Sequence, residues 1–568
     1  MMKRLILAVI STVMIASAVV AQTVQDGVKA LYYEQFKKAK VIFKNILAAN
    51  PADPEANYWL GQAYIYDDSV QAAREHYAKA MTATAQNPLI MVGMGHVELL
   101  EKKNAEARAH FDAAIAATAS KKNKKYGDPL VLAGIGRANA DGGIEMGDPA
   151  YGIEKLTQAA ELDPKNPEVM LNIGVNQLKL GPDHGGEAKR AFDAAIQRDP
   201  TYARSYMRIG RIFESQKNTT LFLENYNKAI ETDPKYPPAY LALYTYYQDR
   251  DVNKAKELLD QYIANTERNR ETDFFYADYL FRAGKYQESL TKAKELEAGL
   301  NGEVYPKIHK LIALDQDRLG DSLTARKEME TYMTTENPAK LKGADYSALA
   351  SLYSKFPETL TKADETFAKA LDADTALANK GDIIRQAADV FAKAKDFERQ
   401  YQWLYKGSLL KPDLSATDYY YLGAAAENAA KYDSAMAIYK RYLTKFPDQP
   451  QGYAGQLRAA IKADPDTSKG LALPAIEDYN TFLRKDTAKN KNRIITNIGY
   501  KVYYYVNKTK EYDKAIQSLD EILALDPENS YAKSGKETLL KILNKKASGA
   551  TTKPAPPAAS DGAKSGKR

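Results

Sequence analysis

The chain has 568 residues, 45% of them hydrophobic and 27% charged, which is the composition of an ordinary folded protein. It contains no cysteine, so disulfides, thiolate metal sites, cysteine nucleophiles and lipidation of an N-terminal cysteine are excluded. Most of the net charge of +7 lies at the two ends, on Lys3 and Arg4 and on the basic stretch from Ala547 onward. Nucleic-acid binding needs a basic face along the folded body, so we expect no nucleic-acid partner.

Residues 1–21 are predicted to be a secretory signal peptide. Lys3 and Arg4 precede an apolar run from Leu5 to Val20, and small residues stand before Gln22. The alternative is a membrane anchor, but the run of about 16 residues is shorter than the roughly 20 needed to span a bilayer. We therefore expect an exported, periplasmic protein that is not a lipoprotein and has no transmembrane segment in its mature chain. Envelope association, including association with the outer membrane, is left open.

Residues 22–527 are predicted to consist of helical hairpins, and residues 416–447 show the pattern most clearly. Apolar residues four and three apart in each half place one buried face on each of two helices. A polar turn separates the halves, and Pro447 ends the second helix because it has no backbone N–H to donate. The apolar positions are Tyr419, Leu422, Gly423 and Ala426 in the first helix and Ala435, Tyr439 and Tyr442 in the second.

The same spacing recurs at Leu60, Gly61 and Tyr64 and at Ile209, Gly210 and Phe213, with a period of roughly 34 residues. On these residues the chain resembles the tetratricopeptide repeat family. The resemblance implies an all-α, right-handed superhelical solenoid of about 14 helix-turn-helix units. It also implies that a small residue at the eighth position of each unit lets its two helices approach closely.

Several segments depart from this regular pattern. Residues 141–149 form an insertion, and residues 237–376 drift from the spacing, with Tyr244 at a position that usually holds a small side chain. The drift indicates either bent stacking or a face adapted to a ligand. Residues 528–546 are predicted to be a capping helix, and residues 547–568, rich in Lys, Pro and Ala, to be a disordered tail that serves as a tether or a solubilising segment.

No catalytic constellation is found, so we expect the chain not to be an enzyme and to need no cofactor or metal. The glycine pairs lack the third glycine of a dinucleotide fingerprint, and the five histidines are not spaced as metal ligands on one helix. Asp141, Glu145 and Asp148 offer oxygen ligands for calcium, but they lack the alternation of a calcium loop. The alternative for this insertion is a mobile, glycine-rich link.

The resemblance also implies a binding surface, because first-helix side chains at the second, fifth, ninth and twelfth positions line a concave groove in this family. Tyrosine and arginine, which are enriched in binding hot spots, occupy several of these positions. The alternative is that they are solvated residues of a curved surface. The candidate partner-binding residues are Tyr58, Gln62, Arg204, Met207, Arg211, Tyr420, Glu427, Tyr500 and Tyr503.

The predicted function is a periplasmic scaffold that binds partner proteins or peptides on its concave face, in envelope biogenesis or secretion. The alternative is an envelope protein that binds cell-wall glycan (peptidoglycan), with tyrosines stacked on sugar rings. The 40 tyrosines of the chain leave both hypotheses open.

Overall fold

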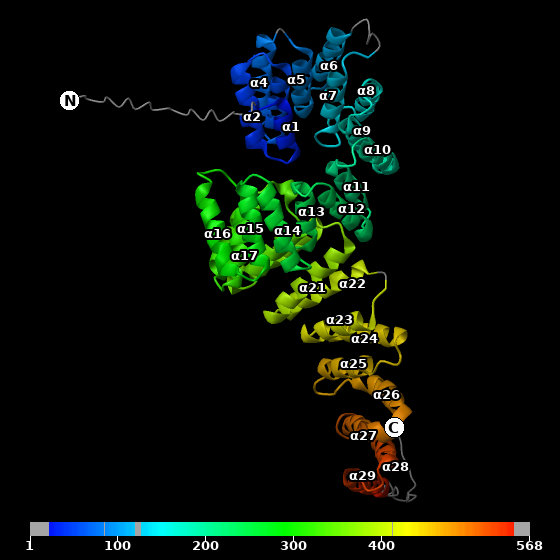
Figure 1. The fold of residues 1–568 in the computed structure, drawn as a ribbon. Coiled ribbons are helices and arrows are strands. Elements are labelled where there is room, and N and C mark those ends of the chain that lie inside the picture. Colours follow the sequence, from blue (N-terminus) through cyan, green and yellow to red (C-terminus); the bar gives the residue numbers. More distant parts are fainter. Residues whose placement is uncertain (1–21, 85, 120–125, 412, 550–568) are drawn as a thin grey trace, which may run out of the picture. The chain divides into compact units, whose positions relative to one another are not determined.

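The computed structural model of the chain describes residues 22–84, 86–119, 126–411 and 413–549 (Figure 1). Within these ranges all regular secondary structure is helical, which confirms the predicted all-α class. The chain divides between Leu319 and Gly320 into two compact units, each a stack of helices. The predicted signal peptide at residues 1–21 and the predicted tail from residue 550 onward lie outside the described residues.

The first unit contains eight successive helix pairs in its described part, followed by α17. A short 3-10 helix, η1 (Pro182–His184), precedes α10. The helices are α1 (Val24–Tyr32), α2 (Phe36–Ala49), α3 (Pro54–Tyr66), α4 (Val70–Ala83), α5 (Pro88–Leu100), α6 (Asn104–Thr118), α7 (Pro129–Ala140), α8 (Pro149–Leu162), α9 (Pro167–Leu180), α10 (Gly185–Arg198), α11 (Ala203–Ser215), α12 (Thr219–Thr232), α13 (Pro237–Tyr247), α14 (Val252–Asn265), α15 (Arg270–Arg282), α16 (Tyr286–Gly299) and α17 (Pro306–Arg318).

The second unit begins with α18, and five helix pairs and a closing helix follow in its described part. Its short helical turns are η2 (Pro338–Lys340), η3 (Pro357–Thr359), η4 (Arg484–Asp486) and η5 (Tyr505–Thr509). The helices are α18 (Ser322–Thr335), α19 (Gly343–Tyr353), α20 (Leu360–Ala373), α21 (Leu377–Lys393), α22 (Phe397–Leu410), α23 (Ala416–Asn428), α24 (Tyr432–Lys445), α25 (Pro450–Ala463), α26 (Ala472–Leu483), α27 (Thr487–Tyr504), α28 (Tyr512–Leu525) and α29 (Ser530–Gly549).

Glycine at the eighth position brings the helices of a pair together, as predicted. A Cβ atom added to Gly61 would lie 2.0 Å from the Tyr77 ring, and one added to Gly210 would lie 2.4 Å from the Tyr226 ring. These distances leave no room for a larger residue, so the aromatic ring of the second helix rests on the backbone of the first. Gly499 in α27 is an exception, because a Cβ atom added there would meet no described neighbour within 4 Å.

Proline and a short polar residue start many of the first helices. Asp53 accepts a hydrogen bond from Ala56 N at 2.9 Å, and Pro54 follows it at the first helical position. A capping acceptor followed by proline favours helix initiation, since the first N–H groups have no partner within the helix. The predicted end before Pro447 is also observed, because α24 ends at Lys445.

Residues 237–376 form regular helices despite the drift in their sequence. Tyr244, at a position predicted to favour a small residue, is buried in α13 and its ring lies edge-on to Phe275, with centroids 6.0 Å apart. The large side chain is therefore accommodated between α14 of its own pair and Phe275 of α15 in the next pair. The closing helix α29 packs Ala532 and Leu539 onto the last hydrophobic cluster, close to the predicted capping segment.

No helix in the described part of the chain combines the length and apolar character needed to cross a membrane.

Candidate binding site in the first unit

A cavity of about 370 Å³ lies inside the first unit and is lined mainly by the first helices of successive pairs. Its wall comes from α1, α3, α7, α9 and α11 and from the start of α13, together with the turn between α1 and α2. Three predicted groove residues, Arg204, Met207 and Arg211, line it. The concave side of these stacked pairs therefore encloses a defined space.

The end of α1 and the start of α2 close this cavity by packing against residues far along the chain. The Tyr32 ring centroid lies 5.1 Å from that of Tyr236 and 5.9 Å from that of Tyr202. Gln35 Nε2 donates to the carbonyl of Asn265 at 3.1 Å. We call these contacts, together with those of Glu267 described next, the closure.

Glu267 contributes the most specific part of the closure. Its carboxylate accepts hydrogen bonds from Lys37 N at 2.8 Å and from Lys38 N at 2.6 Å, across 230 and 229 positions of sequence. These N–H groups are in the first turn of α2, whose own N-cap residue, Gln35, makes no side-chain capping bond. A carboxylate at a helix N-terminus also interacts favourably with the helix dipole. Glu267 therefore caps α2 from the loop that follows α14.

Three arginines of α11 face the cavity in a row, at Arg204, Arg208 and Arg211. The spacing of four and three residues places them on one helix face. Arg204 Cζ lies 5.0 Å from the Tyr32 ring centroid, and Arg211 pairs with Glu214 at 3.2 Å. Arg208 makes no hydrogen bond or contact ion pair with any described residue. We call these three residues the arginine row.

The electrostatic surroundings of Arg208 are unfavourable for its charge. Arg208 is solvent-exposed, but the protein that surrounds it in the cavity lowers its pKa, and the like charges of Arg204 and Arg211 lower it further, although Tyr236 and Asp141 act in the opposite direction. An arginine keeps its proton under these conditions, because its ordinary pKa lies far above neutrality. The cavity therefore holds a positive charge without a contact partner among the described residues.

The opposite wall carries a satisfied ion pair. Arg137 Nη2 lies 2.9 Å from Glu168 Oε1, its Nη1 donates to the Tyr58 hydroxyl at 2.9 Å, and its guanidinium stacks over Trp59. Burial opposes the charge of Glu168, but the Arg137 guanidinium keeps the pKa of that carboxyl below its ordinary value. Glu168 is thus held ionised by its partner and is not free to pair with the arginine row.

A second buried chain of polar contacts ends at Asp141. Gln62 Nε2 donates to the Tyr77 hydroxyl at 3.0 Å, Gln62 Oε1 lies 3.1 Å from His96 Nδ1, and His96 Nε2 lies 3.2 Å from Asp141 Oδ2. Burial would raise the pKa of Asp141, but the His96 contact outweighs it and the pKa is lowered to about 2. Asp141 is therefore a charged carboxylate that already has a partner.

The structure places Tyr58 and Gln62 inside the protein, with exposed fractions of 2% and 0%. Both belong to the hydrogen-bonded wall behind the cavity, and neither presents its side chain on an open surface. Their predicted role in partner binding stays a prediction, and what the structure shows is that they support Arg137 and His96.

The insertion at residues 141–149 is held by a lysine. Lys179 Nζ donates to the carbonyl oxygens of Asn139, Asp141 and Met146 at 2.9, 2.6 and 2.8 Å. Asp148 instead caps α8 by accepting from Tyr151 N at 3.0 Å. Within the described residues the acidic side chains of the insertion form no group suited to a metal ion. The carbonyl oxygens that a cation could bind instead accept hydrogen bonds from the Lys179 ammonium group.

The remaining predicted residues lie in the second unit and do not gather in one cavity. Glu427 is buried and pairs with Arg458 at 3.2 Å and Lys462 at 2.8 Å. Tyr420 is half-buried and Tyr503 is 48% exposed. The Tyr500 hydroxyl is buried and makes no hydrogen bond with any residue that the structure describes.

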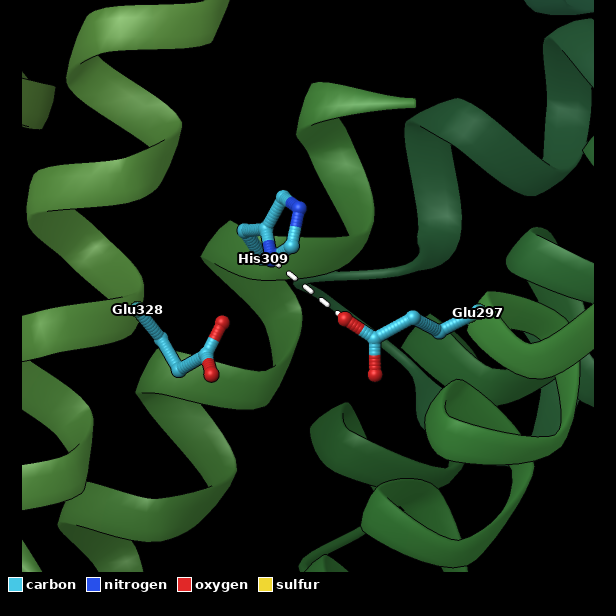
Figure 2. A group of neighbouring side chains, drawn as sticks. All are labelled: Glu297, His309 and Glu328. Atoms are coloured by element: carbon cyan, nitrogen blue, oxygen red, sulfur yellow. Dashed lines mark ion pairs between the residues drawn. The ribbon is translucent and has the colours of Figure 1, made fainter. Parts of the chain in front are cut away.

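His309 is the histidine nearest to a metal-like arrangement. Figure 2 shows its Nδ1 facing Glu297, whose Oε1 is 3.6 Å away. The third side chain drawn, Glu328, belongs to the second unit. Within the first unit this contact offers one histidine and one carboxylate, which are fewer than the three or four protein ligands of a zinc site.

Two residues that line the cavity escaped the sequence reasoning although signals for them existed. Arg137 follows Gly136 directly and so stands at the ninth position, which the groove rule includes. Arg208 stands at the sixth position, which the rule omits, but its spacing from Arg204 and Arg211 marks the same helix face. Glu267 lies in a loop and carries no local signal for its capping role.

A family model described as tetratricopeptide repeat matches residues 29–88 and 184–237. Both segments consist of the helix pairs described above. These two segments match tetratricopeptide repeats, as the resemblance indicated, and repeats of this type suggest a protein–protein interaction scaffold.

Similar solved structures include the C-terminal part of a tetratricopeptide repeat-containing protein from Cytophaga hutchinsonii, at 29% identity over 46% of this chain and 98% of that chain, with a TM-score of 0.30. A tetratricopeptide repeat protein from Parabacteroides merdae is 14% identical over 46% of this chain and 96% of its own, with a TM-score of 0.31. Yeast Tom70 is 15% identical over 65% of this chain and 95% of its own, also with a TM-score of 0.31.

Proposed function

We propose that the protein is a non-catalytic scaffold whose first unit receives a segment of a partner protein in its central cavity. The observation that carries this proposal is a single cavity lined by the first helices of six helix pairs and by the turn between α1 and α2. Arg204, Met207 and Arg211 lie in its wall. Because the closure fixes this space before a partner arrives, binding would cost little conformational entropy on the side of the scaffold.

The proposed setting is the periplasm, in envelope biogenesis or secretion. The support for export is the basic and apolar character of residues 1–21, and the absence of cysteine is consistent with a stability that depends on repeat stacking alone. Envelope association belongs to the same proposal.

Capture of partners from intact cells tests the proposal. The full chain is crosslinked in cells that produce it, purified and examined for attached proteins, with Arg211→Trp as the test variant and Arg190→Trp as its matched control. Arg211 is exposed within the cavity, so tryptophan should block it without repacking the core, whereas Arg190 is 72% exposed on α10 outside the cavity. We expect capture to fall only for Arg211→Trp, and equal capture by both variants would overturn the proposal.

Glycan binding is the second candidate, and exposed tyrosines of the second unit favour it. Tyr421 and Tyr503 are 59% and 48% exposed, so their rings are available to stack on sugars. Retention of the protein on purified peptidoglycan, lost after Tyr421→Ala and Tyr503→Ala, would support this function. Retention on the cell wall without any captured protein would replace the scaffold function with it.

A further inference from the structure

Some charged side chains around the cavity have a partner of opposite charge within ion-pair distance, and others do not. Glu168 pairs with Arg137, Asp141 lies against His96, and Arg211 pairs with Glu214. Arg204 and Arg208 remain without a carboxylate at ion-pair distance among the described residues. Arg204 is half-buried and Arg208 is exposed, so both guanidinium groups can donate charge-assisted hydrogen bonds to an anionic occupant of the cavity.

Arg204 is held in a position suited to bind such an occupant. Its guanidinium lies over the Tyr32 ring and beside Tyr236, whose pKa burial raises and Arg204 lowers. Stacking occupies the face of a guanidinium and leaves N–H groups at its edge free to donate to a carboxylate, in a bidentate manner where geometry permits. Tyr32 therefore acts as a positioning residue for Arg204.

Tyr32 and Arg204 belong to different helix pairs, which the closure brings together. Tyr32 is the last residue of α1, and it lies over Arg204 of α11 close to the bonds by which Gln35 and Glu267 hold the first pair against α14 and the following loop. If the closure opens, Arg204 loses the ring that orients it. The arginine row therefore has all three side chains in place only when the closure is formed.

We propose that the arginine row, assembled by the closure, binds carboxylate groups of an acidic segment of the partner protein. The inference rests on the proposed function, and it adds the chemical class of the partner and the residues that recognise it. A cavity of about 370 Å³ is at the small end of ligand sites, which suits a short run of acidic side chains rather than a folded surface.

Fluorescence anisotropy of a labelled hexaglutamate peptide with the full chain tests the proposal. We expect saturable binding that weakens with salt, and a loss of at least about tenfold in affinity for Arg208→Ala, because charge-assisted hydrogen bonds are among the strongest polar contacts. Arg190→Ala, which removes an exposed arginine outside the cavity, is the matched control and should leave affinity unchanged. Equal affinities for the wild type and Arg208→Ala would overturn the proposal.

A second set of variants tests the role of the closure. Tyr32→Phe keeps the stacked ring and should bind like the wild type, since the Tyr32 hydroxyl makes no hydrogen bond with a described residue. Tyr32→Leu removes the ring and Glu267→Gln weakens the closure, and each should reduce affinity about threefold or more. If Tyr32→Leu and Glu267→Gln both bind like the wild type, the claim that the closure assembles the site is wrong.

Two outcomes separate this inference from the proposed function. Proteins captured in cells by a chain that does not bind hexaglutamate would overturn the acidic partner and leave the scaffold function standing. Hexaglutamate binding by a chain that captures no protein would support the acidic site and overturn the scaffold function. Citrate binding as tight as hexaglutamate binding, and equally dependent on Arg208, would show that the occupant is a small polycarboxylate and would overturn the proposed segment.

Discussion

The carboxylate of Glu267 caps helix α2 through the backbone N–H of Lys38, although the two residues are 229 positions apart. A single side chain thereby links the first helix pair to the loop between α14 and α15. The contact joins the first helix pair to a later part of the same stack, so that the repeats enclose a cavity. Stacked repeats usually contact only their neighbours, so this long-range bond is an added constraint on the first unit.

Glu267→Gln is predicted to loosen the start of α2. The amide removes the negative charge at the helix N-terminus, and we expect a cost of about 1 kcal/mol in the local stability of this turn. Hydrogen exchange should accelerate at Lys37 and Lys38. Glu295→Gln, which removes an exposed carboxylate paired with Lys292, is the control and should change neither amide. Unchanged protection in Glu267→Gln would mean that the cap contributes nothing.

Two glycines at the same repeat position are predicted to respond in opposite directions to alanine. At Gly210 the new methyl group would overlap the Tyr226 ring, so Gly210→Ala should destabilise the protein by about 1–3 kcal/mol. At Gly499 no described neighbour lies within 4 Å, so Gly499→Ala should stabilise α27 by about 0.5–1 kcal/mol through higher helix propensity. Urea unfolding measures both, and a shift of the same sign would contradict the packing described here.

Asp315 is predicted to make stability fall as pH rises. Burial raises its pKa to about 7, and the charge of Asp278 adds to the effect. Since the folded pKa lies above the ordinary 3.8, the folded chain retains a proton that the unfolded chain releases, and stability decreases between about pH 4 and pH 7. Asp315→Asn should therefore gain about 2–4 kcal/mol above pH 7 relative to wild type.

The geometry around Asp315 agrees with a protonated carboxyl. Ser289 Oγ lies 2.9 Å from Ala277 O and 2.7 Å from Asp315 Oδ2, and one hydroxyl hydrogen cannot serve both acceptors. Thermal unfolding from pH 4 to pH 8 checks the prediction, with the exposed Asp260→Asn as control. Parallel pH profiles for wild type and Asp315→Asn would contradict it.

Lys179→Met is predicted to release the insertion at residues 141–149. The ammonium group donates to three carbonyl oxygens, and its loss should cost about 1.5–3 kcal/mol because these are charge-assisted bonds. Hydrogen exchange of the insertion should rise, and addition of calcium should not restore it. Lys189→Met removes an exposed lysine of α10 as the control. Restoration by calcium would show that the loop carbonyls favour a metal ion.

Glu34→Gln is predicted to tighten the binding of acidic peptides. Glu34 lines the cavity from the turn after α1, burial raises its pKa, and Arg204 attracts its charged form. Removing this competing carboxylate should increase hexaglutamate affinity about threefold or more, consistent with the effect of a nearby like charge in a partly desolvated site. Anisotropy titration measures the change, and weaker binding would indicate that Glu34 supports the site.

The sequence was sufficient to predict the helix pairs and part of the cavity. The spacing of Gly210 and Tyr226 predicts their contact because both lie within one hairpin, and the groove rule placed Arg204 and Arg211 on the face that lines the cavity. The rule failed to show that Tyr58 would be covered, because α3, α5 and α7 pack closely enough to bury it in one cluster.

The closure could not be predicted from sequence. Its contacts depend on the curvature of the stack, which is the sum of small rotations between successive pairs, and no local pattern at Glu267 or Gln35 reports that sum. The same reason hides the pairing of Tyr32 with Arg204. Charge spacing within α11 was readable, but the ring that orients one of its arginines belongs to another repeat.

Site-specific photo-crosslinking in intact cells tests the central claim most directly. A photoreactive residue is placed at Arg211 inside the cavity and, in a separate chain, at Arg190 outside it. The account predicts a crosslinked partner protein from position 211 and none from position 190. Crosslinks from position 190 alone, or cell-wall material with no protein from either position, would contradict it.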